Sequence, residues 1–297
     1  MGISLNAETR AKVRYIISLF LYGTIGLLLH YISGSSEFVV LCRSAIGVTF
    51  ILVLYIVTGQ RPDFAVIKAN GRNLLFSGLC LGLNWITLFA AYRVMTVAVA
   101  SLCNHMAPIF ILILTPLVLK EKLSLRKSVC VLAAFLGIAM VSGVIDSAGN
   151  FNVKGIVLGL TAAFGFVGVV FCNKDLSEVP ILDKTVVQIF TAMLLVLPYV
   201  IMRRGDIVLP TDIRSIALIV VLGVFNTGIA DILYFDSIAN IPVQSIAILG
   251  YLDPVIAVLT STVILHEKMS LCGVIGTILV LGAALYSEMP NSTPGVH

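Results

Sequence analysis

Long apolar stretches alternate with short polar connections along the whole 297-residue chain. A membrane-spanning α-helix needs about 20 mostly apolar residues, and ten stretches reach or approach that length. The ten predicted spans are Val13–Tyr31, Phe38–Val57, Leu74–Val94, Ala98–Leu119, Leu125–Val144, Val153–Asn173, Thr185–Met202, Ile213–Phe235, Val243–Leu265 and Leu271–Ser287. The apolar runs are continuous, whereas the strands of a transmembrane β-barrel alternate between apolar and polar residues. The pattern therefore predicts an all-α polytopic membrane protein with ten transmembrane helices.

Composition narrows the class of protein further. Apolar residues make up 59% of the chain and charged residues only 11%, whereas a soluble domain has about 25% charged residues. This composition excludes a water-soluble monomer. It also excludes a disordered chain, which would combine low hydrophobicity with high net charge. The six cysteines all lie in apolar stretches without a C-x-x-C pair, so we interpret them as buried free thiols rather than metal ligands.

The distribution of basic residues predicts the orientation. If the N-terminus is cytoplasmic, twelve of the 19 lysines and arginines lie on the inner side, six lie on the outer side and Arg43 lies within a span. Cytoplasmic loops carry the excess of positive charge in membrane proteins. We therefore expect both termini in the cytoplasm and the protein in the plasma membrane. The polar start from Met1 to Arg14 has no small-residue cleavage site, so the first apolar stretch is interpreted as a retained span.

The chain also contains an internal repeat. Pro108 is followed thirteen residues later by EKLSL, and Pro254 is followed thirteen residues later by EKMSL, a shift of 146 residues. The repeat divides the chain into residues 1–148 and 149–297, each with five predicted spans. Because five is an odd number, the second half is expected to be inverted relative to the first. Many secondary transporters have this architecture, with the substrate site where the two halves meet.

Motifs in both halves give the sequence a family resemblance. The first half contains LNWITLFAAY at residues 83–92, VAVASL at 97–102 and the pair AP at 107–108; the second contains IAILGYLDPV at 246–255 and LHEK at 265–268. From about Tyr15 to Ser287 the chain resembles the drug/metabolite transporter superfamily, specifically proteins built from two EamA domains. The resemblance implies a central cavity lined by spans one to four and six to nine. Members of the family carry amino acids, amines, sugars and other metabolites, so the resemblance leaves the substrate open.

Charged residues within the predicted spans are the main functional candidates, because a charge near the bilayer centre costs about 2.5 to 3.5 kcal/mol on insertion scales. Arg43 stands where the family frequently has arginine and could bind a substrate carboxylate; alternatively it reaches the interface or pairs with Glu37. Asp231 is a candidate substrate counter-ion or proton carrier. The 146-residue shift maps Trp85 onto Asp231, and an aromatic face near a carboxylate would suit a cation. The alternative for Trp85 is an interfacial anchor.

The third charged candidate is Asp253, which stands where the family often has glutamate. It precedes Pro254, and a proline within a helix frees a carbonyl one turn earlier, here that of Gly250. A carboxylate beside such an opened turn could bind a proton or a cation. The alternative is a helix cap near the edge of the membrane.

Further polar residues in the spans complete the candidate site. His105, the repeat counterpart of Tyr251, can titrate near neutral pH, although a lone histidine is more often structural. The candidate substrate-binding residues are Arg43, Asn84, Trp85, Asn104, His105, Gln188, Asp231, Tyr234 and Tyr251. The candidate proton-coupling residues are Asp231 and Asp253, and the candidate gating or packing residues are Gly23, Gly26, Gly165, Gly168, Pro108 and Pro254.

The sequence contains no Walker motif, no paired Cys/His motif and no nucleotide-binding glycine-rich loop. We therefore expect no catalytic residues and no metal, cofactor, ATP or nucleic acid. The hypothesis is a secondary transporter, monomeric or homodimeric, that exports amino acids or related amines by alternating access, with the proton as candidate coupling ion. The alternatives are uptake of a quaternary amine such as choline, a passive channel and, in another class, a membrane-embedded enzyme.

Overall fold

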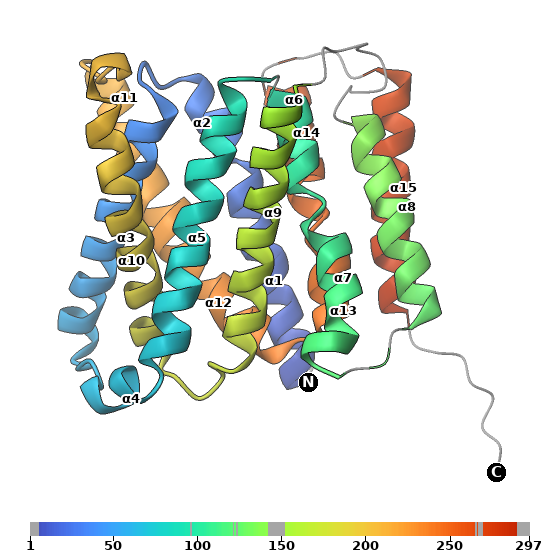
Figure 1. Ribbon diagram of the computed structural model, residues 1–297, viewed down its shortest axis with the longest axis horizontal. Helices are drawn as coiled ribbons and strands as arrows, with labels where there is room; N and C mark the ends of the chain where they lie inside the picture. The colour runs from blue at the N-terminus through green and yellow to red at the C-terminus, as the bar shows by residue number, and fades with distance from the viewer. Residues whose placement is uncertain are drawn as a thin grey trace, which may run out of the picture.

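The chain folds into a bundle of helices that run up and down side by side (Figure 1). The computed structural model describes residues 6–95, 97–120, 122, 124–141, 152–264, 266 and 270–289, and all regular secondary structure within these ranges is helical. Nine helical segments of at least 18 residues in these ranges are long and apolar enough to cross a membrane. The prediction of an all-α polytopic membrane protein is therefore confirmed.

The helices follow the predicted apolar stretches closely. In the first half they are α1 (Ala7–Gly23), α2 (Ile25–His30), α3 (Ser36–Thr58), α4 (Phe64–Ala69), α5 (Gly71–Tyr92), α6 (Val97–Asn104), α7 (Ala107–Val118) and α8 (Leu125–Val141). In the second half they are α9 (Val153–Lys174), α10 (Ile181–Met202), the short η1 (Arg204–Asp206), α11 (Ile213–Gly223), η2 (Val224–Ile229), α12 (Ala230–Asn240), α13 (Val243–Leu249), α14 (Leu252–Ile264) and α15 (Leu271–Glu288).

The fifth predicted span coincides with α8, which has 17 residues and is the one predicted span missing from the nine. Its expected continuation to Val144 lies outside the described residues, as do Glu121, Glu267 and Lys268 of the repeated motif. The count of ten spans therefore remains a prediction.

Two of the predicted spans are broken rather than continuous. The fourth is divided into α6 and α7 around His105, and the ninth into α13 and α14 at Gly250 and Tyr251. At both breaks one backbone amide donates a hydrogen bond to the carbonyl oxygen four residues earlier, at 2.9 Å, as in an α-helix. The next amide donates to the carbonyl oxygen only three residues earlier. The tighter turn ends the first half-helix. The apolar pattern does not report a single turn of changed hydrogen bonding, so it gives the position of each span but not these breaks.

The eighth span contains a π-helical segment, η2, between α11 and α12. Close packing against α3 accompanies it: a Cβ on Gly223 would lie 2.5 Å from Ile46, and one on Gly47 would lie 2.9 Å from Thr227. A π-helical turn has a wider repeat than an α-helix and shifts the faces of the residues that follow it. The segment brings Thr227 against α3 and sets the direction of the residues in α12.

Glycines allow several other helices to approach closely. A Cβ on Gly165 of α9 would lie 2.7 Å from the carbonyl oxygen of Cys80 in α5, and one on Gly168 would lie 2.6 Å from the Cys80 sulfur. A Cβ on Gly23 would lie 2.9 Å from the carbonyl oxygen of Asp253. At Gly26, by contrast, a Cβ would meet no described atom within 4 Å. Close packing therefore accounts for three of the four predicted glycines and not for Gly26.

Replacing Gly165 by alanine is expected to destabilise the bundle by about 1 to 3 kcal/mol, because the added methyl group meets the backbone of α5. Thermal unfolding in detergent measures the effect, with Gly26→Ala as the matched control. That control should be neutral or stabilising by up to about 1 kcal/mol, because alanine favours a helix over glycine. Equal thermal midpoints for the two variants would contradict the close α5–α9 contact.

Candidate functional site

A buried cavity of about 70 Å³ lies at the centre of the bundle. It is lined by Tyr15, Leu19, Tyr22, Asn104, His105, Ala107, Pro108, Ile111, Phe166, Tyr234, Ile246, Gly250 and Asp253. These residues come from α1, α9 and α12 and from the two broken spans, so both helix breaks contribute to the cavity wall. A cavity of this size holds a few water molecules.

Aromatic side chains form much of this wall. The ring of Tyr234 lies 5.6 Å from that of Tyr15, 5.7 Å from that of Tyr22 and 6.0 Å from that of Phe166, measured between centroids. The Tyr15 hydroxyl donates a hydrogen bond to the carbonyl oxygen of Ile246 (3.1 Å). The hydroxyl of Tyr234 is buried without a hydrogen-bond partner in the described part of the chain. The cavity therefore offers a hydroxyl able to bond a ligand.

Asp253 reaches the cavity from the first turn of α14. A carboxylate in the first turn is stabilised by the positive end of the helix dipole. The sequence suggested that the carbonyl of Gly250 is free. In the structure it accepts a hydrogen bond from the Asp253 amide at 3.4 Å. That expectation is wrong because the helix already breaks at Gly250 and Tyr251. Pro254 then lies in the first turn of α14, where a backbone N–H would have no partner within the helix, so the proline breaks no helical hydrogen bond.

Asp231 lies behind the cavity wall, where it is 6% exposed. The hydroxyl of Tyr22 donates a hydrogen bond to one oxygen of its carboxylate. The second oxygen is buried without a hydrogen-bond partner among the described residues. A buried polar group without a partner is costly, so this oxygen is a candidate acceptor for a ligand or a proton.

Arg43 lies close to this carboxylate and is 9% exposed. Its guanidinium lies over the Trp85 ring, 5.1 Å from the centroid, and its Nη1 lies 3.5 Å from the Thr227 hydroxyl. Arg43 and Asp231 attract each other electrostatically, although no direct ion pair joins them in the described structure. The Nε of Arg43 is buried without a hydrogen-bond partner there. The guanidinium therefore keeps unused capacity to bind an anionic group.

The alternative pairing of Arg43 with Glu37 is wrong. Glu37 instead pairs with Arg93, whose Nη2 lies 2.6 Å from the Glu37 carboxylate, at the end of the bundle where α3 begins and α5 ends. The hydrogen bond to Glu37 raises the pKa of the Arg93 guanidinium. Arg93 thus neutralises Glu37 and leaves Arg43 to the interior.

The other predicted site residues lie in different places. Asn104 and His105 line the cavity, and Asn84 donates a hydrogen bond to the Asn104 side chain at 2.9 Å. Tyr251 is fully buried at the break between α13 and α14, and its hydroxyl has no hydrogen-bond partner in the described ranges. Gln188 lies apart: it exchanges hydrogen bonds with Asn173 and accepts one from Ser77 at 2.5 Å. This separate cluster joins α5, α9 and α10.

Sequence reasoning missed several participants. Thr227, which contacts Arg43, is an ordinary residue in an apolar span, and its position depends on the π-helical segment. Tyr15 and Phe166 gave no signal beyond being aromatic. Tyr22 is not among the predicted site residues, although it connects Asp231 to the cavity. Within the described ranges, no group of three metal-binding side chains was found.

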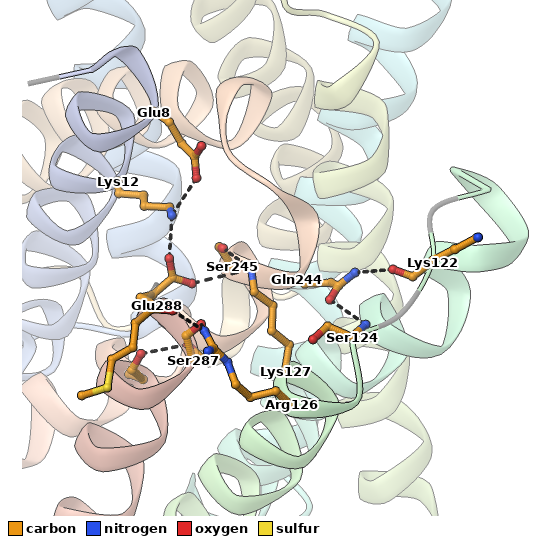
Figure 2. Close-up of polar contacts among 12 residues, drawn as sticks. Glu8, Lys12, Lys122, Ser124, Arg126, Lys127, Gln244, Ser245, Ser287 and Glu288 are labelled. Carbon is orange, nitrogen blue, oxygen red and sulfur yellow. Dashed lines mark hydrogen bonds and ion pairs between the residues drawn. The ribbon is translucent and has the colours of Figure 1, made fainter. Parts of the chain in front are cut away.

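A polar network at the lower end of the bundle in Figure 1 connects α1 to the last helices (Figure 2). Lys12 of α1 pairs with Glu8 at 2.7 Å and with Glu288 of α15 at 2.6 Å. Lys127 of α8 lies 3.9 Å from the same Glu288 carboxylate and donates a hydrogen bond to Ser245 of α13 at 3.0 Å. A carboxylate in the last turn of a helix is disfavoured by the helix dipole, so Glu288 depends on these two lysines.

The same network joins the remaining helix ends. Arg126 donates through its Nη2 to the backbone carbonyls of Ser287 (2.8 Å) and Met289 at the end of α15. Gln244 donates to the Lys122 carbonyl at 2.9 Å and accepts from the Ser124 amide at 3.2 Å. The start of α8 is therefore fastened to both α13 and α15. Because α1 also carries Tyr15 and Tyr22, one helix connects this network to the cavity wall.

Comparison with known proteins places these features in a family. Residues 13–143 and residues 153–288 each match the EamA-like transporter family. An "Uncharacterized transporter YxxF" of Bacillus subtilis (strain 168) is 24% identical over 287 residues, covering 96% of this chain and 91% of the relative. An "Uncharacterized transporter" of Archaeoglobus fulgidus is 27% identical over 233 residues, which cover 73% of this chain and 80% of the relative. A crystal structure with 18% sequence identity has a TM-score of 0.82, covering 94% of this chain and 97% of the other; this likeness shows the fold.

Replacing Lys12 by glutamine should loosen the lower end of the bundle. It removes the shorter of the two lysine contacts of Glu288 and leaves the longer one, to Lys127; a partly exposed ion pair is worth up to about 1 kcal/mol. Hydrogen exchange should increase in the last turn of α15 and the first turns of α1. Lys68→Gln is the matched control, because Lys68 is exposed on α4, away from the network. Unchanged exchange in Lys12→Gln would contradict the proposed fastening.

Proposed function

This chain belongs to the EamA-like transporter family, a part of the drug/metabolite transporter superfamily, and from this premise we propose that it carries amino acids or related small amines across the plasma membrane by alternating access. One observation carries the proposal. Two carboxylates and an arginine, Asp231, Asp253 and Arg43, lie in or beside a single buried cavity within an otherwise apolar bundle. Charges inside a membrane protein are rare and usually mark a substrate or ion pathway.

The chemistry of these groups fits a zwitterionic substrate. The carboxylate of Asp253 lies in the cavity wall and could accept hydrogen bonds from an ammonium group. The guanidinium of Arg43 matches the geometry of a carboxylate, to which arginine can donate two parallel hydrogen bonds. The Tyr234 hydroxyl lacks a hydrogen-bond partner among the described residues and could bond either group. An amino acid would supply the missing partner of each.

The size of the cavity supports a transport cycle with an occluded state. About 70 Å³ is much less than the roughly 300 to 1,000 Å³ of typical small-molecule sites. A metabolite can therefore bind only if the surrounding helices move. The two helix breaks lie in the cavity wall, and the backbone hydrogen bonds there already depart from the α-helical pattern. We therefore expect α6/α7 and α13/α14 to be the segments that move. Gly23, packed against α14, provides a third contact that must slide.

We also propose the inverted architecture expected from the repeat, with halves at residues 1–148 and 149–297. The matching breaks support it, because α6 ends at Asn104 and α13 ends at Leu249, within one residue of the 146-residue shift. The family match occurs once in each half. The excess of basic residues on one side supports cytoplasmic termini. In this orientation the polar network of Figure 2 lies at the cytoplasmic end.

A second candidate substrate is a quaternary amine. The rings of Tyr15, Tyr22 and Phe166 surround that of Tyr234, and aromatic faces attract quaternary ammonium groups. Such a substrate has no carboxylate and would not need Arg43. The two candidates therefore differ in how they depend on that one residue.

The role of the carboxylates is tested by transport into proteoliposomes with and without a pH gradient. Asp253→Asn should raise the KM for the amino acid by about ten- to hundredfold, because it removes a charge-assisted hydrogen bond. If Asp231 carries the proton, Asp231→Asn should retain exchange of labelled for unlabelled substrate and lose the response to the pH gradient. Glu178→Gln, at an exposed position on the connection before α10, serves as control. The proton role is excluded if both asparagine variants respond to the gradient as the wild type does.

The class of substrate is tested with Arg43→Gln. Transport of an amino acid should fall by about tenfold or more through loss of the guanidinium–carboxylate contact, whereas transport of choline should be unaffected. Loading the substrate on one side at a time measures direction, and we expect export. An unchanged rate for the amino acid in Arg43→Gln, together with choline transport by the wild type, would favour the quaternary amine. Chemical conversion of the recovered substrate would indicate an enzyme.

A further inference from the structure

A second, larger concavity lies away from the central cavity, on the flank formed by α8 and α15 at one side of the bundle (Figure 1). Its volume is about 650 Å³. It is lined by small residues, including Ala133 and Gly282, and by larger apolar residues such as Val129 and Ile278. Val129 and Ile278 are 57% and 65% exposed. On a membrane-spanning bundle, such side chains face the hydrocarbon.

The crossing of the two helices explains why the groove is there. α8 and α15 approach closely where Gly137 meets Gly276: a Cβ on Gly137 would lie 2.7 Å from the Gly276 carbonyl oxygen. Toward the lower end, the two helices present small side chains to each other and leave space between them. At Gly282 a Cβ would meet no described atom within 4 Å, so the groove has room for a further group at this position.

The length of the groove matches one leaflet of a membrane. It extends along α15 from Ile278 to Tyr286, which is about 12 Å at the helical rise per residue. Half of the hydrocarbon core is about 15 Å. An extended acyl chain parallel to the helices would therefore fill the groove without leaving its leaflet.

The positively charged side chain of Arg126 lies at the lower end of the groove. Arg126 lines the groove, and its guanidinium lies 5.5 Å from the centroid of the Tyr286 ring. Both hydrogen bonds that Arg126 makes to α15 come from Nη2. A guanidinium has five N–H donors, so several remain for an anion. Arg126 lies in the first turn of α8, at the end of the bundle where the headgroups of that leaflet would lie.

We propose that this groove binds one acyl chain of an anionic phospholipid whose phosphate contacts Arg126. The apolar walls provide the contact with the chain, and the arginine provides a bidentate partner for a phosphate oxygen pair. Basic pockets between transmembrane helices are suited to anionic headgroups. A second copy of the chain fits less well. A two-fold axis along the membrane normal would bring the same patch of both copies together and place their two Arg126 side chains near each other.

Native mass spectrometry of the purified protein tests the proposal. The protein is incubated with phosphatidylglycerol or with phosphatidylcholine of identical chains, and retained lipids and thermal midpoints are measured. The wild type should retain one phosphatidylglycerol in preference to phosphatidylcholine and unfold at a higher temperature with it. Arg126→Gln should weaken this binding by about tenfold or more, the loss expected for hydrogen bonds to a charged group.

Two further variants keep the test independent of folding. Gly282→Leu fills the groove and leaves Arg126 and its bonds to α15 in place, so it should abolish retention of the lipid. Arg61→Gln removes an exposed arginine on the connection between α3 and α4, two helices that lie on the other side of the bundle, and should bind as the wild type does. Equal retention of the two lipids by the wild type, or normal binding by Gly282→Leu, would overturn the proposal. A covalent dimer formed through Val129→Cys in nanodiscs would also overturn it, by assigning the groove to a second copy.

Discussion

Hydrocarbon does not solvate a charged or hydrogen-bonding group, and this constraint governs where every polar side chain of the bundle lies. Arg43 is accommodated because the face of Trp85 and the carboxylate of Asp231 compensate its charge. Asp231 in turn takes a hydrogen bond from Tyr22. The interior therefore contains a chain of partly satisfied groups rather than isolated charges. The hydrogen-bonding capacity that Arg43 and Asp231 leave unused is available to a ligand.

The same constraint explains where irregular backbone occurs. Non-helical turns are tolerated at membrane depth only where protein surrounds them or where they line a cavity. The breaks at His105 and at Gly250 meet that condition, because both residues line the central cavity. The π-helical segment meets the same condition because it packs against α3 so closely that a side chain would not fit at the glycine positions of the contact. Irregularity is thus concentrated where the bundle would have to change shape.

The positions of the spans could be predicted from the sequence because twenty apolar residues in a row have few alternatives to a helix. The partners of the polar residues could not be predicted in the same way. Gln188 was predicted to belong to the substrate site, yet the facing residues on α5 and α9, Ser77 and Asn173, use its amide group in a separate cluster. Glu37 was a plausible partner for Arg43 until the fold placed Arg93 beside it. Spacing along a helix identifies a face, whereas only the packed structure identifies what lies opposite.

The network at the lower end joins the first helix of the chain to the last. Lys12 and Glu288 are in contact although almost the entire sequence lies between them. During synthesis α1 leaves the ribosome well before α15. Lys12 therefore reaches the membrane surface long before its partner exists, and its ammonium group must remain with water or lipid headgroups until α15 has been made. A nascent chain that stops before α15 cannot form this contact, so the lower end of the bundle can close only after α15 has been inserted.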